Sequence, residues 1–309
     1  MDKDVHAYIV RNIAQYFKID EDTVDQLCHY TTIPDEKAQE HIRNFKMPEP
    51  RNILDQIGNA STWMGNALVE LWKWTYLHGS GASEQFLAHF EVAYDLLVRN
   101  QNKDNENHKR GIKNLGYCLH YITDVGTPFH SKNWEDVITP HLEKYTNQYE
   151  KLTNDEIREF NREVLWTILM FLCYHSEFET KMQIEWNSNM QDQYIMAIIK
   201  GVDDSDRLPR HKKIEDILHI MQTEIVRLRD FSAGQYDNLD KAYRGISCLK
   251  GGSAPEEIAV YEKEIRRIGL LCIYEISKFI ASTLTMFFQK KKVSANRSER
   301  AQRARGRST

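Results

Sequence analysis

The residues best suited to chemistry lie in the segment LGYCLHYITDVGTPFH, which begins at Leu115. On a helix, His120 and Asp124 lie one turn apart on the same face, so an imidazole and a carboxylate can bind one ion. Pro128 ends that helix and turns the chain, which brings His130 back toward the same region. Histidine and carboxylate ligands suit Zn²⁺, and Mn²⁺ and Fe²⁺ accept the same ligand types. The segment therefore predicts a metal site.

A second pair of the same kind follows downstream, and further ligand types precede the segment. His175 and Glu179 are four residues apart, which fits a ligand pair and an exposed amphipathic pair equally well when it is taken alone. His6 stands at the start of the first expected helix, and Asp35 and His41 lie near an expected connection between helices. Together these residues offer nitrogen and oxygen ligands without cysteine.

The elements that position these residues are predicted to be helices. Apolar residues recur at steps of three and four, no segment alternates as a strand does, and no repeat has a fixed period. Capping boxes at Thr153 and Ser253 predict two helix starts, and residues 250–253 form the plainest loop. An all-α, single multi-helix domain over residues 1–289 is expected. Its clearest helices cover residues 60–77, 86–98, 111–124, 214–228 and a last helix that ends near residue 288.

Composition agrees with a globular chain. Of 309 residues, 41% are hydrophobic and 28% are charged, which disfavours a wholly disordered protein. With 14 glycines and 7 prolines, turn-dense all-β folds are also disfavoured. The net charge of −4 selects no partner. Residues 290–309 carry eight basic side chains and one acidic one, which predicts a disordered basic tail able to make peripheral contact with an anionic membrane.

The expected location is cytoplasmic. Five scattered cysteines form no disulfide framework and fit a reducing compartment. The first residues, MDKDVHAYIV, carry acids where a secretory signal needs positive charge. No stretch approaches 18 uncharged apolar residues, so no transmembrane helix is expected.

The segment LGYCLHYITDVGTPFHSKN resembles the signature of zinc-dependent phospholipases C, which are all-helical bacterial enzymes related in fold to P1-type nucleases. The resemblance covers residues 1 to about 180 in patches. Those patches include HAYIVRN from His6, Pro34-Asp35 with His41, and HSEFE from His175. By resemblance, one metal is held by Asp35, His41, His120 and Asp124. A second is held by His130, His175 and Glu179. A third uses His6 and shares Asp124.

The resemblance implies a metal-dependent phosphoester hydrolase with two or three zinc ions. In that family a metal-bound water attacks a phosphodiester while the ions neutralise the phosphate charge. Asp35 would orient this water, and Asp124 is the second candidate catalytic residue. The implied substrate is a phosphate-containing small molecule or lipid, and no stable nucleic-acid partner is expected.

The chain departs from the family pattern in three places, one of which is the short gap between Asp35 and His41. Family members begin with a tryptophan that binds the third metal, whereas this sequence begins Met1-Asp2. The spacing from His130 to His175 is longer than in the family, and His141 lies nearer the expected distance. His175 with Glu179 is preferred because Tyr145, four residues after His141, is no substitute for a glutamate ligand.

Two other functions stay open at this point. The same metals could bind a diphosphate and assist its departure, as in an isoprenoid diphosphate lyase or terpene cyclase. Residues 203–206, DDSD, precede a proline and look like a loop rather than the helical aspartate cluster of such enzymes. A non-catalytic helical scaffold is the third alternative. A P1-type nuclease is disfavoured because its Asn-x-His-x-x-x-Asp ligand segment is missing from the expected place.

Overall fold

Helices account for nearly all of the chain that the structure describes. The computed structural model describes residues 3–36, 81–99, 105–132, 173–186, 190–206, 213–249 and 255–291, with a few single residues besides. Of these residues, 87% are helical and none belongs to a strand, which confirms the all-α prediction. Within the same ranges, no helix combines the length and apolar character needed to cross a bilayer.

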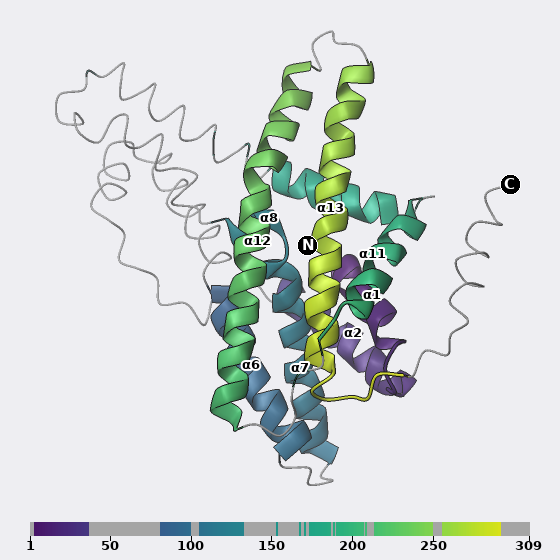
Figure 1. The fold of residues 1–309 in the computed structure, drawn as a ribbon, viewed down its shortest axis with the longest axis vertical. Helices are drawn as coiled ribbons and strands as arrows, with labels where there is room; N and C mark the ends of the chain where they lie inside the picture. The colour runs from purple at the N-terminus through teal and green to yellow at the C-terminus, as the bar shows by residue number, and fades with distance from the viewer. Residues whose placement is uncertain are drawn as a thin grey trace, which may run out of the picture.

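Two long helices form the axis of the molecule. Helix α12 (Ile214–Leu249) and helix α13 (Pro255–Leu284) pack side by side and run in opposite directions (Figure 1). The remaining elements pack along them, with α6 against α7, α7 against α2, α2 against α1, and α11 against α13. Their bounds are α1 Lys3–Ala14, α2 Glu21–Glu36, α6 Gly81–Tyr94, η1 Asp95–Arg99, α7 Asn105–Val125, α8 Pro128–Ser131 and α11 Gln191–Asp203. Residues 173–186 are also helical.

Helix α7 occupies the centre of the bundle and is buried on most of its surface. Its apolar residues Ile112, Leu115, Leu119 and Ile122 are fully buried in a hydrophobic cluster that also draws on α1, α6, α12 and α13. Polar residues of its last two turns are buried as well, including Thr123. A buried helix that carries polar side chains must give them partners in the interior. This region of α7 is where the predicted ligands lie.

Several helix boundaries differ from those expected. Helix α7 ends before Pro128 as predicted, because proline disfavours a helical residue ahead of it. Helix α12 continues beyond residue 228 through the exposed Gly234, because Tyr236 and Leu239 extend its buried stripe. Helix α13 ends at Leu284 rather than near residue 288, and turns follow it.

Some of the other predicted elements differ in the structure, and some lie outside the described residues. The helix expected over residues 86–98 is split into α6 and the π-helical turn η1. Pro34 and Asp35 were expected near a connection, but both lie in the last turn of α2. The helix expected over residues 60–77, most of the one expected after Thr153, and the loop at residues 250–253 lie outside the described residues.

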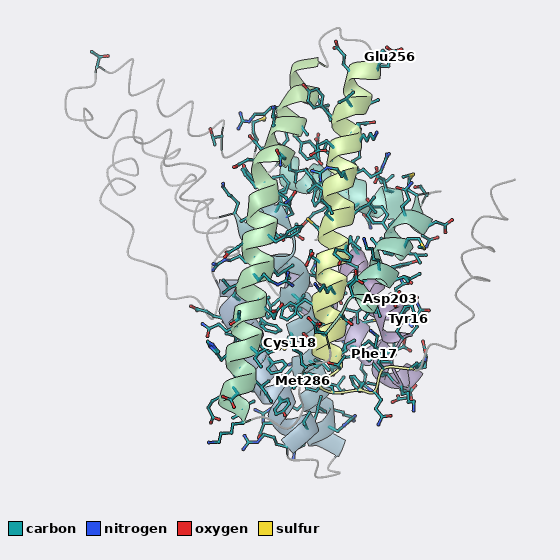
Figure 2. The ribbon with its side chains drawn as sticks, viewed as in Figure 1. Tyr16, Phe17, Cys118, Asp203, Glu256 and Met286 are labelled. Atoms are coloured by element: carbon teal, nitrogen blue, oxygen red, sulfur yellow. The ribbon has the colours of Figure 1, made fainter. Side chains whose placement is uncertain are left out.

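The segment that follows α1 pairs with the last described residues of the chain. Lys18 N–H donates to the carbonyl of Gln289 at 2.8 Å, and Lys291 N–H donates to the carbonyl of Tyr16 at 2.8 Å. Figure 2 shows Tyr16 and Phe17 at the same end of the bundle as Met286, with Glu256 at the opposite end of α13. The described chain thus continues to residue 291, inside the predicted basic tail, whose other residues lie outside the described part.

Candidate metal centre

Three buried side chains converge where α1 meets α7. His120 Nε2 lies 3.0 Å from Asp124 Oδ2, and His6 Nε2 lies 3.5 Å from Asp124 Oδ1. The rings of His6 and His120 stack with centroids 4.6 Å apart. One ligand atom from each residue lies within 4.8 Å of the other two, and all three residues are buried. One ion could therefore contact the whole group, which we term the first cluster.

Helix α2 sets the orientation of the His120 ring. His120 Nδ1 lies 2.9 Å from the carbonyl oxygen of Thr31, and a carbonyl can only accept. Nδ1 therefore carries the proton, as it does in metal-bound histidines whose second nitrogen is held by a carbonyl. The opposite nitrogen, Nε2, then faces the Asp124 carboxylate. A proton or a metal ion must lie between these two groups to make their approach favourable.

The close approach of α2 to α7 depends on Gly116. A Cβ atom at this position would lie 2.5 Å from the Cβ of Tyr30 and 3.2 Å from its carbonyl carbon. Thr31 Oγ1 also donates to the carbonyl of Leu27 at 2.7 Å and lies 3.3 Å from the carbonyl of Gly116. Gly116 lies one turn before His120, so this contact fixes the carbonyl that holds the histidine ring.

A second group of three side chains lies between α8 and the helix over residues 173–186. His175 Nε2 lies 3.0 Å from His130 Nε2 and 2.8 Å from Glu179 Oε1. His130 Nε2 lies 3.3 Å from the same glutamate oxygen. These three residues form the second cluster. The structure thus brings the His175/Glu179 pair to His130, whereas His141 lies outside the described residues.

The chain between α7 and α8 is short and tightly held. Pro128 occupies the first turn of α8, where its missing N–H costs nothing. Thr127 Oγ1 donates to the carbonyl of Thr123 at 3.0 Å, which ties the turn to the last turn of α7. A Cβ atom at Gly126 would lie 2.0 Å from Ile276 Cγ1 of α13. The turn therefore places His130 close to Asp124 through backbone geometry.

The second cluster is the more open of the two. The His175 and Glu179 side chains are 19% and 21% exposed, whereas those of His6 and His120 are fully buried. Phe129 stacks on the His175 ring with centroids 5.5 Å apart and restricts its rotation. Catalytic zinc sites keep an open position, and structural sites are closed. Solvent therefore has access to the second cluster.

Electrostatics favour metal-binding protonation states. Burial would raise the pKa of Asp124, but His120, and to a smaller extent His130, holds it well below its usual value when those rings are protonated. Burial would likewise raise the pKa of Glu179, and the surrounding positive charge, including His175, holds it well below. Burial lowers the pKa of His130, which disfavours protonation of its ring. Carboxylates and neutral imidazoles are the forms that bind metal.

The two clusters are neighbours. When protonated, His130 of the second cluster lowers the pKa of Asp124 in the first cluster. The Asp124 carboxylate in turn acts to raise the pKa of His130. Thr127 N–H donates to the carbonyl of Asp124 at 2.8 Å and His130 N–H donates to the carbonyl of Thr127 at 3.0 Å, so a single turn separates the two clusters. The arrangement is therefore a candidate binuclear metal centre.

Several separations between ligand atoms lie near those of a tetrahedral zinc site. Zinc–nitrogen distances of about 2.0–2.1 Å in tetrahedral geometry place neighbouring ligand atoms about 3.3 Å apart. The second cluster has separations of 2.8, 3.0 and 3.3 Å. The first has 3.0 and 3.5 Å between its carboxylate oxygens and imidazole nitrogens. Each cluster supplies two histidines and one carboxylate, which is a donor set known for catalytic zinc.

Two predicted ligands are not placed. The backbone of Asp35 lies in α2, but its side chain is outside the described residues, as is all of His41. Sequence reasoning missed the carbonyl of Thr31 as the orienting group, and a backbone acceptor leaves no signal in residue type. Phe129 could have been noticed because it directly precedes a predicted ligand.

No family model matches the chain, and comparisons with curated proteins and with solved structures give no significant match. The two clusters are therefore interpreted from their own geometry.

Proposed function

We propose that the protein is a metal-dependent hydrolase of phosphoester bonds, of the zinc-dependent phospholipase C and P1-nuclease fold type, with a binuclear zinc centre. One observation carries the proposal: two neighbouring clusters each present two imidazoles and one carboxylate whose ligand atoms lie within 4.8 Å of one another. Adjacent divalent ions suit a substrate with a bridging phosphate, because both its attacking and leaving oxygens need charge stabilisation.

The residues of each cluster have distinct tasks. His6, His120 and Asp124 would hold one ion in the closed cluster, and Thr31 keeps the His120 ring in the required tautomer. Asp124 carries a full negative charge because its pKa is low, and each of its oxygens faces a different imidazole. Both imidazoles, those of His6 and His120, belong to the first cluster, so either oxygen of Asp124 could bind the ion of that cluster.

The other ion would be held by His130, His175 and Glu179, and substrate would approach from this more exposed side. When bound, the ions lower the pKa of water to about 7 and offset phosphate charge. Glu179 supplies the single negative charge of this cluster, so the loaded site keeps a net positive charge that attracts a phosphate. Phe129 shields one face of His175 from water and fixes the direction of its Nε2 atom.

The test combines metal content with hydrolysis. Protein purified without chelator is expected to contain zinc by elemental analysis and to cleave bis(p-nitrophenyl) phosphate. His120→Ala and His175→Ala should each remove the metal of the cluster that holds the altered residue, and each should abolish activity. His219→Ala is the matched control, because His219 is an exposed histidine on α12 and belongs to neither cluster.

Other outcomes would redirect the proposal. Less than one metal per chain would exclude it. Bound zinc without phosphodiester cleavage would point to a structural centre, and release of hydrocarbon from farnesyl diphosphate would point to a diphosphate lyase. Degradation of single-stranded DNA that His120→Ala abolishes would place the protein with the nucleases.

A further inference from the structure

A buried ionic network lies beyond the ligands on the helix over residues 173–186. The Glu185 carboxylate accepts a hydrogen bond from Tyr194 Oη of α11 at 2.7 Å. Its other oxygen accepts two from Arg266 of α13, from Nε at 3.1 Å and Nη2 at 3.0 Å. Glu185 and Tyr194 are buried. Three elements are therefore joined at one carboxylate.

This network is connected to the helices of both clusters. Glu185 lies less than two turns beyond Glu179 on the same helix. The neighbouring Trp186 packs edge-on against Tyr8 of α1 with ring centroids 3.9 Å apart. Gln191 Nε2 of α11 donates to Tyr8 Oη at 2.6 Å. Tyr8 lies two residues after His6 on α1, so α1 contacts this region through Trp186 and Gln191 and not through Glu185.

The second cluster needs such support more than the first. His130 is fixed by the short turn after α7, but His175 and Glu179 come from a separate helix that must meet it. A shift of about 1 Å along that helix would be enough to spoil a metal site. Apolar contacts such as those of Met182 tolerate small sliding, whereas a forked arginine–carboxylate bond specifies one position.

We propose that Glu185 is a positioning residue for the second cluster. Its bonds to Arg266 and Tyr194 set the depth and rotation at which the helix over residues 173–186 presents His175 and Glu179 to His130. This inference rests on the proposed function, because it requires the second cluster to bind metal.

The experiment measures zinc affinity at each cluster separately. His120→Asn isolates the second cluster, and His175→Ala isolates the first. Adding Glu185→Gln to the first of these backgrounds should weaken zinc binding by about 10-fold or more, as loss of an outer support commonly does. Adding it to the His175→Ala background should leave the affinity of the first cluster unchanged. A general loss of stability would weaken zinc binding at both clusters, so an effect on the second cluster alone indicates a positioning role.

The chain offers a matched control on the same two helices. Lys181 and Glu262 form an ion pair at 3.5 Å between the helix over residues 173–186 and α13, and the Glu262 side chain is 48% exposed. Glu262→Gln should not change zinc affinity at either cluster. Tyr194→Phe removes one hydrogen bond without a charge and should weaken the second cluster less than Glu185→Gln does, which provides a milder test if the glutamine variant folds poorly.

The outcomes separate the two proposals. Unchanged second-cluster affinity in both Glu185→Gln and Tyr194→Phe, with zinc still bound by the unaltered chain, overturns the positioning role alone. Equal weakening at both clusters also overturns it. Absence of zinc from the unaltered chain overturns the proposed function and the positioning role with it.

Discussion

Replacing Gly116 by alanine tests the geometry that supports the first cluster. The new Cβ would lie 2.5 Å from the Cβ of Tyr30, whereas carbon atoms pack at about 3.5–4.0 Å. Helix α2 must therefore retreat by about 1 Å. The distance from His120 Nδ1 to the Thr31 carbonyl, now 2.9 Å, would then exceed the hydrogen-bond range. Overpacking costs about 1–3 kcal/mol, and the lost bond adds about 1 kcal/mol.

The expected result of Gly116→Ala has two parts. Urea unfolding should show a decrease of about 2–4 kcal/mol in the free energy of unfolding. Zinc titration should show a decrease of about 10–100-fold in the affinity of the first cluster, because the ring of His120 loses its orienting acceptor. The second cluster should keep its affinity.

Gly234 of α12 provides a control, because the same substitution there creates no close contact. It lies on a helix, is exposed, and a Cβ atom there would meet nothing within 4 Å. Gly234→Ala should therefore stabilise the protein by about 0.5–1 kcal/mol and leave zinc binding unchanged. If Gly116→Ala is as stable as the unaltered chain and binds zinc equally well, the close approach of α2 does not position His120, and this reasoning is wrong.

Three further predictions follow from the same geometry. Removing zinc with a chelator should lower the free energy of unfolding by about 2.7 kcal/mol for each site at which free zinc had been 100 times its Kd. Thermal unfolding with and without added zinc measures this change. An unchanged unfolding midpoint would contradict the prediction. In metal-free protein, stability should fall as pH drops below about 6.5, because unfolded His130 takes up a proton that the folded state resists. It should fall again below about 4.5, because the folded pKa of Glu179 is depressed and its contribution, complete above that pH, is lost as pH falls through the folded value. Urea midpoints between pH 8 and pH 4 check both, and a flat profile would refute them. Iodoacetamide at pH 8 should modify the exposed Cys173 and spare Cys118, because burial raises the pKa of the Cys118 thiol; mass spectrometry of the labelled peptides would expose the opposite order.

Helix boundaries could be predicted from the sequence where neighbouring residues determine them. The end of α7 before Pro128 could be predicted because proline constrains the residue ahead of it. The continuation of α12 past Gly234 could not, since it depends on Tyr236 and Leu239 finding a core supplied by other helices. The same distinction explains why the last turn of α2 contains Pro34 where a connection was expected.

For the candidate site, too, the sequence revealed the features within one helix but not those that join distant segments. His120 with Asp124, and His175 with Glu179, were visible as pairs because a helix places residues four apart on one face. The carbonyl of Thr31 and the support of Glu185 left no comparable pattern, because both act through chain segments that are distant in sequence.

By itself, the sequence determined that this chain is helical and that it carries imidazole–carboxylate pairs at ligand spacing. The family resemblance assigned His130 to the pair near residue 175 and His6 to Asp124, but only the tertiary structure brings His6 to the pair on α7 and His130 to the other pair. The physical reason is the distance along the sequence between the residues that make each contact. Spacing within one helix follows from hydrogen bonds between neighbours, whereas contacts between helices follow from how the whole core packs.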